Sequence, residues 1–302
     1  MIYLIKRKYK PDKTFTMKND GFFGELYIST DNIFNGKCII AFGGSEGNFL
    51  LTQLCADKFK DAGISVMIIA YHGKNGLPKI LKNQPVDVIE NSAKYLLNNG
   101  YKQIGVWGIS MGGCLALLAG SLMPELISCI VSIAPLQMVM QAEKSKIPIE
   151  GSSFSFHGTE LPFVRYVRQG KAWKQEMKKA MWKHKEPYTK DLLRLAYKEN
   201  KNRSAEIKVE NIKAPILLLG GAMDSMCPNE ETFNDITQRL KSSDFSYHVE
   251  SIIYPHLSHY VLPIKPLSAK MFLAERKYPN ECNKERVESW EDTLSFLKTY
   301  WK

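Results

Sequence analysis

The sequence lacks any long apolar run. No stretch of its 302 residues approaches the roughly 18 consecutive apolar residues that a membrane-spanning helix needs. At the N-terminus a few apolar residues precede a basic run, whereas a secretory signal places its charge first and then about 7–15 apolar residues. We therefore expect a cytoplasmic protein without a membrane span or a secretion signal.

Paired cysteines are also missing. Six cysteines are spread along the chain without a C-x-x-C or C-x-x-H pair: Cys38, Cys55, Cys114, Cys129, Cys227 and Cys282. This spacing excludes a typical zinc site and the disulfide framework of a small secreted domain. We expect reduced cysteines that serve in packing, and a site without a metal or another cofactor.

Acidic residues are in the minority. The chain has 41 Lys and Arg against 31 Asp and Glu, so its formal net charge is +10. Residues 141–205 contain 15 of the basic and 7 of the acidic residues, and this segment alone carries +8. Such an excess suits a nucleic acid, a membrane surface or an anionic substrate. The content of 44% hydrophobic residues excludes wholesale disorder.

Short apolar runs alternate with helical patterns along most of the chain. This alternation is typical of a mostly parallel sheet covered by helices on both faces. After two short strands within 13–30, around a turn at 19–21, strands are expected at 37–42, 64–71, 104–109, 127–134, 214–221 and 248–254. Helices are expected at 49–61, 86–98, 111–122, 229–241 and from about Glu285. The alternation stops at about 136–206, which indicates an insertion into one domain spanning 1–302.

A candidate nucleophile lies in the segment Gly108-Ile109-Ser110-Met111-Gly112, which matches G-x-S-x-G. In this motif the serine occupies a strained turn between a strand and a helix, so nearly side-chain-free neighbours are needed. The expected strand before Ser110 and the expected helix after it supply that context. The plain alternative is a glycine-rich turn without a catalytic role.

The acid and the base are expected at the ends of two later strands. In an α/β-hydrolase the triad follows the order Ser, Asp or Glu, His. The strand at 214–221 leads to Asp224, and the strand at 248–254 leads to His259. His259 would take the proton of Ser110, and Asp224 would orient the imidazole and stabilise its charged form.

Both positions have alternatives nearby. His256 directly follows the strand end, but His259 lies further into the loop that must reach the serine, so we favour His259. Glu230 and Glu231 are weaker candidates than Asp224, because they fall on the following expected helix.

An oxyanion hole needs two backbone N–H donors. Met111, directly after the serine, is the first candidate. The second is expected in the glycine-rich segment 43–47, where Ser45 is our choice and Gly44 and Glu46 are alternatives. This segment lacks the G-x-G-x-x-G spacing of a dinucleotide site.

Five segments are characteristic in combination: FGGSEGN (42–48), AYHGKNGLPK (70–79), GISMGG (108–113), IKVENIKAPILLLGGAMDSMCP (207–228) and YPHLSHYVLP (254–263). Together they resemble the C-terminal catalytic domain that acyl-CoA thioester hydrolases share with bile acid-CoA:amino acid N-acyltransferases. The resemblance covers about residues 36–265. It implies an α/β-hydrolase fold, a triad of Ser110, Asp224 and His259, and an acyl thioester or a related ester as substrate.

The sequence departs from that family in three ways. About 35 residues precede the first core strand, too few for the immunoglobulin-like domain of the mammalian members. The amino-acid-conjugating branch uses a cysteine nucleophile, whereas this motif has Ser110, and Cys114 lies one helical turn further on. His256 stands where the family tends to have a small residue. The serine favours hydrolysis over transfer to an amine.

The basic insertion is expected to form a helical lid over the serine. Its lysines, among them Lys178, Lys179, Lys183 and Lys185, are candidates for binding the phosphates of a CoA thioester. The alternative is a solvated helical face. Six aromatic residues of the insertion are candidates for lining an acyl pocket: Phe154, Phe156, Phe163, Tyr166, Trp173 and Trp182.

The sequence thus predicts a serine hydrolase that cleaves an acyl thioester, such as an acyl-CoA, or a related carboxylic ester through an acyl-enzyme. A general carboxylesterase, a dienelactone-hydrolase-like enzyme and an acyl-CoA:amino acid N-acyltransferase are the enzymatic alternatives. A basic binding scaffold without catalysis is another. Nucleic-acid binding would need a recognisable module, which the sequence lacks. The expected partner is a small acyl ester or thioester, and the sequence indicates no oligomeric state.

Overall fold

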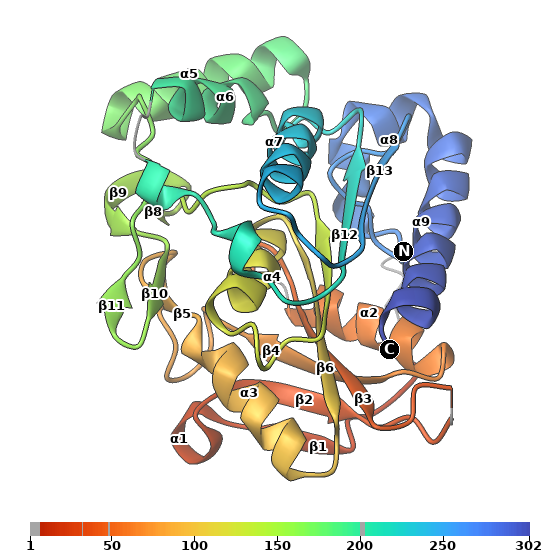
Figure 1. Cartoon of the computed structure of the whole chain (residues 1–302). Helices are drawn as coiled ribbons and strands as arrows, with labels where there is room; N and C mark the ends of the chain where they lie inside the picture. Colours follow the sequence, from red (N-terminus) through yellow and green to blue (C-terminus); the bar gives the residue numbers. More distant parts are fainter. Residues whose placement is uncertain (1–6, 32, 48, 200–202) are drawn as a thin grey trace.

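A mostly parallel sheet forms the centre of the molecule. The computed structural model describes residues 7–31, 33–47, 49–199 and 203–302. In this part of the chain eight strands form one sheet in the order β1-β2-β4-β3-β6-β7-β12-β13. They are β1 (Lys13–Phe15), β2 (Phe23–Tyr27), β3 (Lys37–Phe42), β4 (Ser65–Ala70), β6 (Gln103–Ile109), β7 (Cys129–Ile133), β12 (Ile216–Gly221) and β13 (Val249–Tyr254). The six strands β4, β3, β6, β7, β12 and β13 run parallel to one another. At the lower end in Figure 1, β2 pairs antiparallel with both β1 and β4.

Helices cover both faces of this sheet, as expected (Figure 1). One face carries α2 (Phe49–Asp61) and α9 (Pro279–Tyr300); the other carries α3 (Asp87–Asn98), α4 (Met111–Leu122) and α7 (Asn229–Ser242). Between α2 and α9 the rings of Phe59 and Trp290 meet edge-on, with centroids 5.0 Å apart. Because both faces are covered, the residues of the inner strands are almost all buried, and those strands are near-continuous apolar runs in the sequence.

The insertion lies between β7 and β12 and contains strands as well as helices. Its second half has helices, as expected: α5 (Gly170–His184) and α6 (Lys190–Glu199). Its first half has the short strands β8 (Gln141–Lys144), β9 (Ile147–Ser152), β10 (Phe154–Phe156) and β11 (Thr159–Glu160). β8 pairs with β9, while β10 pairs with β11 and with β5 (Gln84–Pro85), from the loop before α3. The sequence does not reveal these strands, because such short runs carry too little alternation.

Most elements of the main sheet and its helices begin and end within two residues of the expected ranges. The C-terminal helix is an exception, since it begins at Pro279 rather than near Glu285. The first residues of this helix lack apolar side chains at helical spacing, so the pattern does not indicate a helix there. Proline is nevertheless favourable at the first position of a helix. Between β1 and β2, α1 (Met17–Asp20) is a single helical turn, closed by Gly21 with a φ of 74°.

All six cysteines are free and buried, in agreement with a packing role. The described residues contain no helix that combines the length and the hydropathy required to cross a lipid bilayer.

Candidate active site

Ser110 lies at the junction of β6 and α4. Its φ of 60° and ψ of −120° form a strained conformation for a residue with a side chain. A Cβ on Gly108 would collide with the carbonyl of Gly112, and a Cβ on Gly112 would collide with the carbonyl of Gly43. The N–H of Ser110 donates to the carbonyl of Ile133 on β7 at 2.7 Å. Close backbone packing around the serine therefore requires the glycines of G-x-S-x-G.

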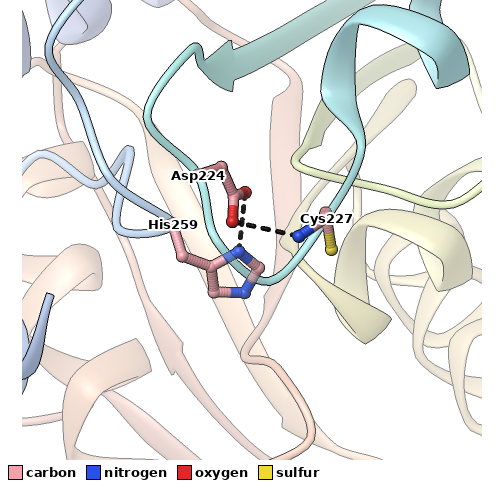
Figure 2. A group of neighbouring side chains, drawn as sticks. All are labelled: Asp224, Cys227 and His259. Carbon is pink, nitrogen blue, oxygen red and sulfur yellow. Dashed lines mark hydrogen bonds and ion pairs between the residues drawn. The ribbon is translucent and has the colours of Figure 1, made fainter. Parts of the chain in front are cut away.

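Asp224 and His259 lie on the loops after β12 and β13, and their side chains are in contact (Figure 2). His259 Nδ1 is 2.9 Å from Asp224 Oδ2. Asp224 Oδ1 accepts hydrogen bonds from the backbone N–H groups of Met226, at 2.7 Å, and Cys227, at 3.0 Å. Asn229 Nδ2 donates to Asp224 Oδ2 at 3.1 Å. These bonds hold the carboxylate in one orientation toward the imidazole ring.

These contacts also determine the charges of the pair. Asp224 is 1% exposed and His259 is 7% exposed, so burial alone opposes the charged form of each. The pKa of Asp224 is nevertheless lowered, because His259 and two backbone N–H groups favour the carboxylate. The pKa of His259 is raised against the effect of burial, because the negative charges of Asp224 and, more weakly, Glu46 favour the imidazolium. The environment therefore favours a positive charge on the ring.

All three triad candidates lie at one edge of the sheet. The parallel strands β6, β7, β12 and β13 are neighbours, so their C-terminal ends meet at the same edge. Ser110 follows β6, Asp224 follows β12 and His259 follows β13. The structure brings Asp224 and His259 into contact, whereas no hydrogen bond among the described residues joins Ser110 to His259. In ligand-free enzymes such bonds are often long and shorten when substrate binds.

The alternative acid and base candidates have other partners. His256 Nδ1 is 2.6 Å from Glu285 Oε1 on α9. Glu231 accepts a bond from Arg194 Nε at 2.7 Å, and Glu230 is exposed on the same helix, α7. None of these side chains takes the place of Asp224 or His259.

The proposed oxyanion donors lie in the loop after β3 and at the start of α4. Among the described residues no acceptor is found for the N–H of Met111 or of Ser45. The same holds for Gly44 and Glu46. Met111 and Ser45 therefore stay predictions.

Sequence reasoning did not find the residues that hold the His259 loop. Glu285 Oε2 accepts hydrogen bonds from the backbone N–H groups of His256, at 2.8 Å, and Leu257, at 3.0 Å. Glu285 is buried and lies on α9, far along the chain from the loop. No local pattern in the sequence indicates such a contact.

A buried ion pair supports the same loop from its other side. Glu275 on α8 (Leu273–Lys277) is 2.6 Å from Arg286 on α9. Glu275 also accepts a bond from Ser258 Oγ at 3.1 Å, and Arg286 donates to the carbonyl of Tyr260 at 3.5 Å. The residues before and after His259 are therefore both attached to this pair.

The side chain of Glu46 places a further charge beside the serine. A Cβ built on Gly44 would lie 2.7 Å from Glu46 Oε2 and 3.3 Å from the Cβ of Ser110. The carboxylate and the serine are thus close neighbours around Gly44. The sequence indicates Glu46 only as a possible amide donor, because nothing local shows where its side chain lies.

The four candidate lysines lie on α5 or directly after it. Lys178, Lys179, Lys183 and Lys185 are exposed. Lys179 pairs with Glu176 at 3.4 Å, and the other three have no ion pair with any described residue. None of the four bonds to the triad candidates.

The chain after α5 is attached to the Asp224 loop. The N–H groups of Thr189 and Lys190 donate to the carbonyl of Ser225 at 3.0 and 3.1 Å. Ser225 Oγ donates to the carbonyl of Pro187 at 2.8 Å. The C-terminal end of the basic helix is therefore held beside the candidate site.

The insertion's aromatic residues do not share one environment. Phe154, Tyr166 and Trp173 are buried, and the rings of Tyr166 and Trp173 lie 4.4 Å apart. Phe156 and Phe163 are half-buried. Trp182 is 86% exposed, so the expectation that it lines an acyl pocket is wrong. Its helix turns the residue outward, which hydrophobicity alone does not reveal.

Two side-chain groups of the described residues have atoms close enough to share a metal ion. The first is Asp224, Cys227 and His259 (Figure 2). Burial and nearby Asp224 raise the pKa of the Cys227 thiol well above its ordinary range in the metal-free protein. The second, Asp87, Glu90 and His157, lies on α3 and the β10–β11 turn, and Lys94 already pairs with Glu90 at 2.6 Å. The expectation of a site without metal stays a prediction.

Two cavities formed by the described residues are not lined by Ser110. One of about 560 Å³ lies at the opposite edge of the sheet, where residues before β3 and β4 line it. A small one of about 20 Å³ lies behind the glycine-rich loop, lined by Gly44, Tyr71 and His72 among others.

Comparison with known proteins places the chain in a family. Residues 85–301 match the family model described as BAAT / Acyl-CoA thioester hydrolase C terminal. Acyl-coenzyme A thioesterase 1 of Rattus norvegicus is 26% identical over 229 residues, which cover 74% of this chain and 48% of that protein. The mitochondrial acyl-coenzyme A thioesterase 2 of Homo sapiens is 24% identical, with coverage of 74% and 42%. The chain thus spans about half the length of these relatives.

Solved structures share the fold at low sequence identity. A putative dienelactone hydrolase from Klebsiella pneumoniae has a TM-score of 0.57 and 13% identity, covering 92% of this chain and 93% of that chain. An acylaminoacyl peptidase from Pyrococcus horikoshii has a TM-score of 0.53 and 17% identity, with coverage of 93% and 40%. The fold is an α/β-hydrolase fold, as expected. With the family model matching more than two thirds of its length, the chain belongs to the BAAT / acyl-CoA thioester hydrolase C-terminal family.

Proposed function

We propose that this protein is a serine hydrolase that cleaves an acyl thioester of coenzyme A, or a related carboxylic ester, through an acyl-enzyme. Ser110 is the nucleophile, His259 the base and Asp224 the orienting acid. The 2.9 Å contact between His259 Nδ1 and Asp224 Oδ2 supports this proposal most directly. It occurs at the sheet edge where Ser110 has the strained backbone of a nucleophile turn.

The reaction proceeds in two steps, acylation of Ser110 and hydrolysis of the acyl-serine. His259 Nε2 removes the proton of Ser110 as Oγ attacks the acyl carbon, and the imidazolium then protonates the departing thiolate or alkoxide. Water then attacks the acyl-serine, His259 again takes the proton, and Ser110 recovers it when the carboxylic acid is released. The N–H groups of Met111 and Ser45 stabilise the negative oxygen in both steps. Asp224 favours the charged imidazole, in line with the raised pKa of His259.

The nucleophile is tested by labelling with a fluorophosphonate probe, which reacts with activated serines. We expect Ser110→Ala to abolish labelling and turnover. Ser242→Ala, at the exposed end of α7, is the matched control and should label like the unaltered protein. Persistent labelling of Ser110→Ala would refute the assignment.

The leaving group is tested with acyl-CoA thioesters and matched simple esters of the same acids. A preference for thioesters supports a thioesterase, whereas a preference for the esters supports a carboxylesterase or a dienelactone-hydrolase-like enzyme. Release of free acid in the presence of glycine or taurine supports hydrolysis; an amide product supports acyl transfer.

We propose further that the insertion at 136–206 is a lid of a single hydrolase domain and that its lysines attract the phosphates of coenzyme A. Replacing Lys178, Lys179, Lys183 and Lys185 by serine should raise KM for an acyl-CoA more than for the uncharged N-acetylcysteamine thioester of the same acid. A variant with Lys18, Lys102, Lys241 and Lys298 replaced by serine is the matched control. Equal effects on both thioesters would exclude a phosphate contact.

A further inference from the structure

The outward side of α5 combines positive charge with apolar side chains. Trp173 is buried on the inner side, where its indole N–H donates to the carbonyl of Lys146 at 2.8 Å. At helical spacing on the outer side follow basic residues and then two large apolar residues, Met181 and Trp182, which are 46% and 86% exposed. The outer basic residues are Lys171, Lys174, Lys178 and Lys185.

A second exposed segment lies beside the end of α5. It comprises the 3-10 helix η3 (Leu267–Met271) and the start of α8. Leu267, Met271 and Leu273 are 70%, 48% and 40% exposed. The N–H of Leu273 donates to Glu186 at 2.7 Å, and Arg276 Nη2 donates to the carbonyl of Lys185 at 2.8 Å. The two segments are therefore adjacent, and Figure 1 shows α5 and α8 at the same end of the molecule.

Together the two segments form what we call the basic apolar patch. It consists of Lys171, Lys174, Lys178, Met181, Trp182, Lys183, Lys185, Leu267, Lys270, Met271, Leu273 and Lys277. The lysines of the patch outnumber the two nearby acids, Glu176 and Glu186, so the patch keeps a net positive charge. Glu176 pairs with Lys179, and Glu186 accepts the N–H of Leu273. Of the described residues, none forms an ion pair with a lysine of the patch.

The mixed character of the patch restricts what can cover it. A second copy placed on it by two-fold symmetry would bring lysines against lysines, which is unfavourable. A nucleic acid would satisfy the lysines but leave Leu267, Met271 and Leu273 without a partner. An anionic bilayer offers phosphates to the lysines and hydrocarbon to the apolar side chains, with the indole at the level of the headgroups.

We propose that the basic apolar patch docks the protein onto anionic phospholipid membranes. The patch lies at the sheet edge that carries the candidate site, since both of its segments are attached to the catalytic loops. The chain after α5 bonds to the Asp224 loop, and Glu275 of α8 bonds to Ser258 beside His259. Docking would therefore turn this edge toward the membrane. The inference requires no particular reaction and goes beyond the proposed function.

Binding is tested with the Ser110→Ala variant, so that turnover does not interfere. Its co-sedimentation is measured with vesicles of phosphatidylcholine alone and with vesicles in which about one third of the lipid is phosphatidylglycerol. Of the five tryptophans Trp182 alone is exposed, so its emission reports contact with the bilayer. We expect binding to the anionic vesicles only, together with a blue shift of this emission.

Two further variants locate the contact. Replacing Lys171, Lys174 and Lys270 by serine should weaken binding by about 100-fold, because each lysine near an anionic bilayer contributes about fivefold. None of these three is among the lysines assigned to coenzyme A. A variant with Lys102, Lys241 and Lys298 replaced by serine removes the same charge elsewhere and should bind normally. Trp182→Ser should weaken binding, whereas Val287→Ser, at an exposed apolar site on α9, should not.

Three results would overturn the proposal. They are equal binding to neutral and anionic vesicles or to neither, equal loss in the patch and control lysine variants, and a Trp182 blue shift that appears on self-association without lipid. Tighter binding of a single-stranded oligonucleotide than of the anionic vesicles would assign the patch to nucleic acid instead.

Discussion

At the scale of single residues, the orientation of the imidazole depends on one carboxylate. Asp224→Asn should keep an acceptor for the N–H groups of Met226 and Cys227 but lose the negative charge that favours the imidazolium. We expect kcat for an acyl-CoA to fall by about four orders of magnitude, because an amide stabilises the wrong tautomer of the histidine. Steady-state kinetics measure the loss. Glu230→Gln, at the alternative acid on α7, should leave kcat unchanged.

Glu46 should influence the pH dependence of the reaction. His259 acts as a base only when neutral, so kcat/KM rises with pH through its pKa. Burial lowers this pKa, whereas Asp224 and, more weakly, Glu46 raise it. Glu46→Gln removes one raising influence, so the rise of kcat/KM should move to lower pH. A profile between pH 5 and pH 9, in about half-unit steps, measures the shift; an unchanged profile would show that the carboxylate does not act on His259.

At the scale of secondary-structure elements, α9 positions the loop that carries His259. Glu285→Ala would leave the half-buried N–H group of His256 and the buried N–H group of Leu257 without their acceptor. We expect the free energy of unfolding to fall by about 1–3 kcal/mol per unsatisfied group. We also expect kcat to fall by about 100-fold, because the imidazole is misplaced. KM should change little.

Glu288→Ala on the same helix is the matched control, because the carboxylate of Glu288 is exposed enough to pair with Lys284, at 3.5 Å, and among the described residues it has no other ion pair. It should leave both stability and kcat near the values of the unaltered protein. Urea titration and steady-state kinetics distinguish the two variants. If Glu285→Ala lost stability but kept kcat, α9 would support the fold without positioning the base.

The elements also show what local sequence patterns can predict. Most strands and helices of the main sheet follow from their apolar runs and helical periods, and the bounds of these elements agree within two residues. The strands β8 to β11 do not follow, because their pairing partners include β5, far away in the chain. The early start of α9 is missed as well, since Pro279 and the polar residues after it carry no apolar period.

At the scale of the whole molecule, most of the net charge of +10 resides in the insertion. If this charge attracts an anionic substrate, kcat/KM for an acyl-CoA should fall several-fold between about 20 mM and 300 mM salt, as screening shortens the range of the field. The uncharged N-acetylcysteamine thioester should show almost no change. Equal salt dependence for both thioesters would indicate an effect on the protein rather than on attraction.

The sequence by itself determined the alternation of strands and helices and the order Ser110, Asp224, His259 at the ends of three strands. Periodicity and glycine spacing are local properties, and the order of the three residues is read directly along the chain. Only the tertiary structure decided that Asp224 contacts His259 while Glu285 contacts His256, and that Trp182 faces outward. These outcomes depend on contacts between residues far apart in the chain and on which side of a helix is covered, and neither is encoded in a short window.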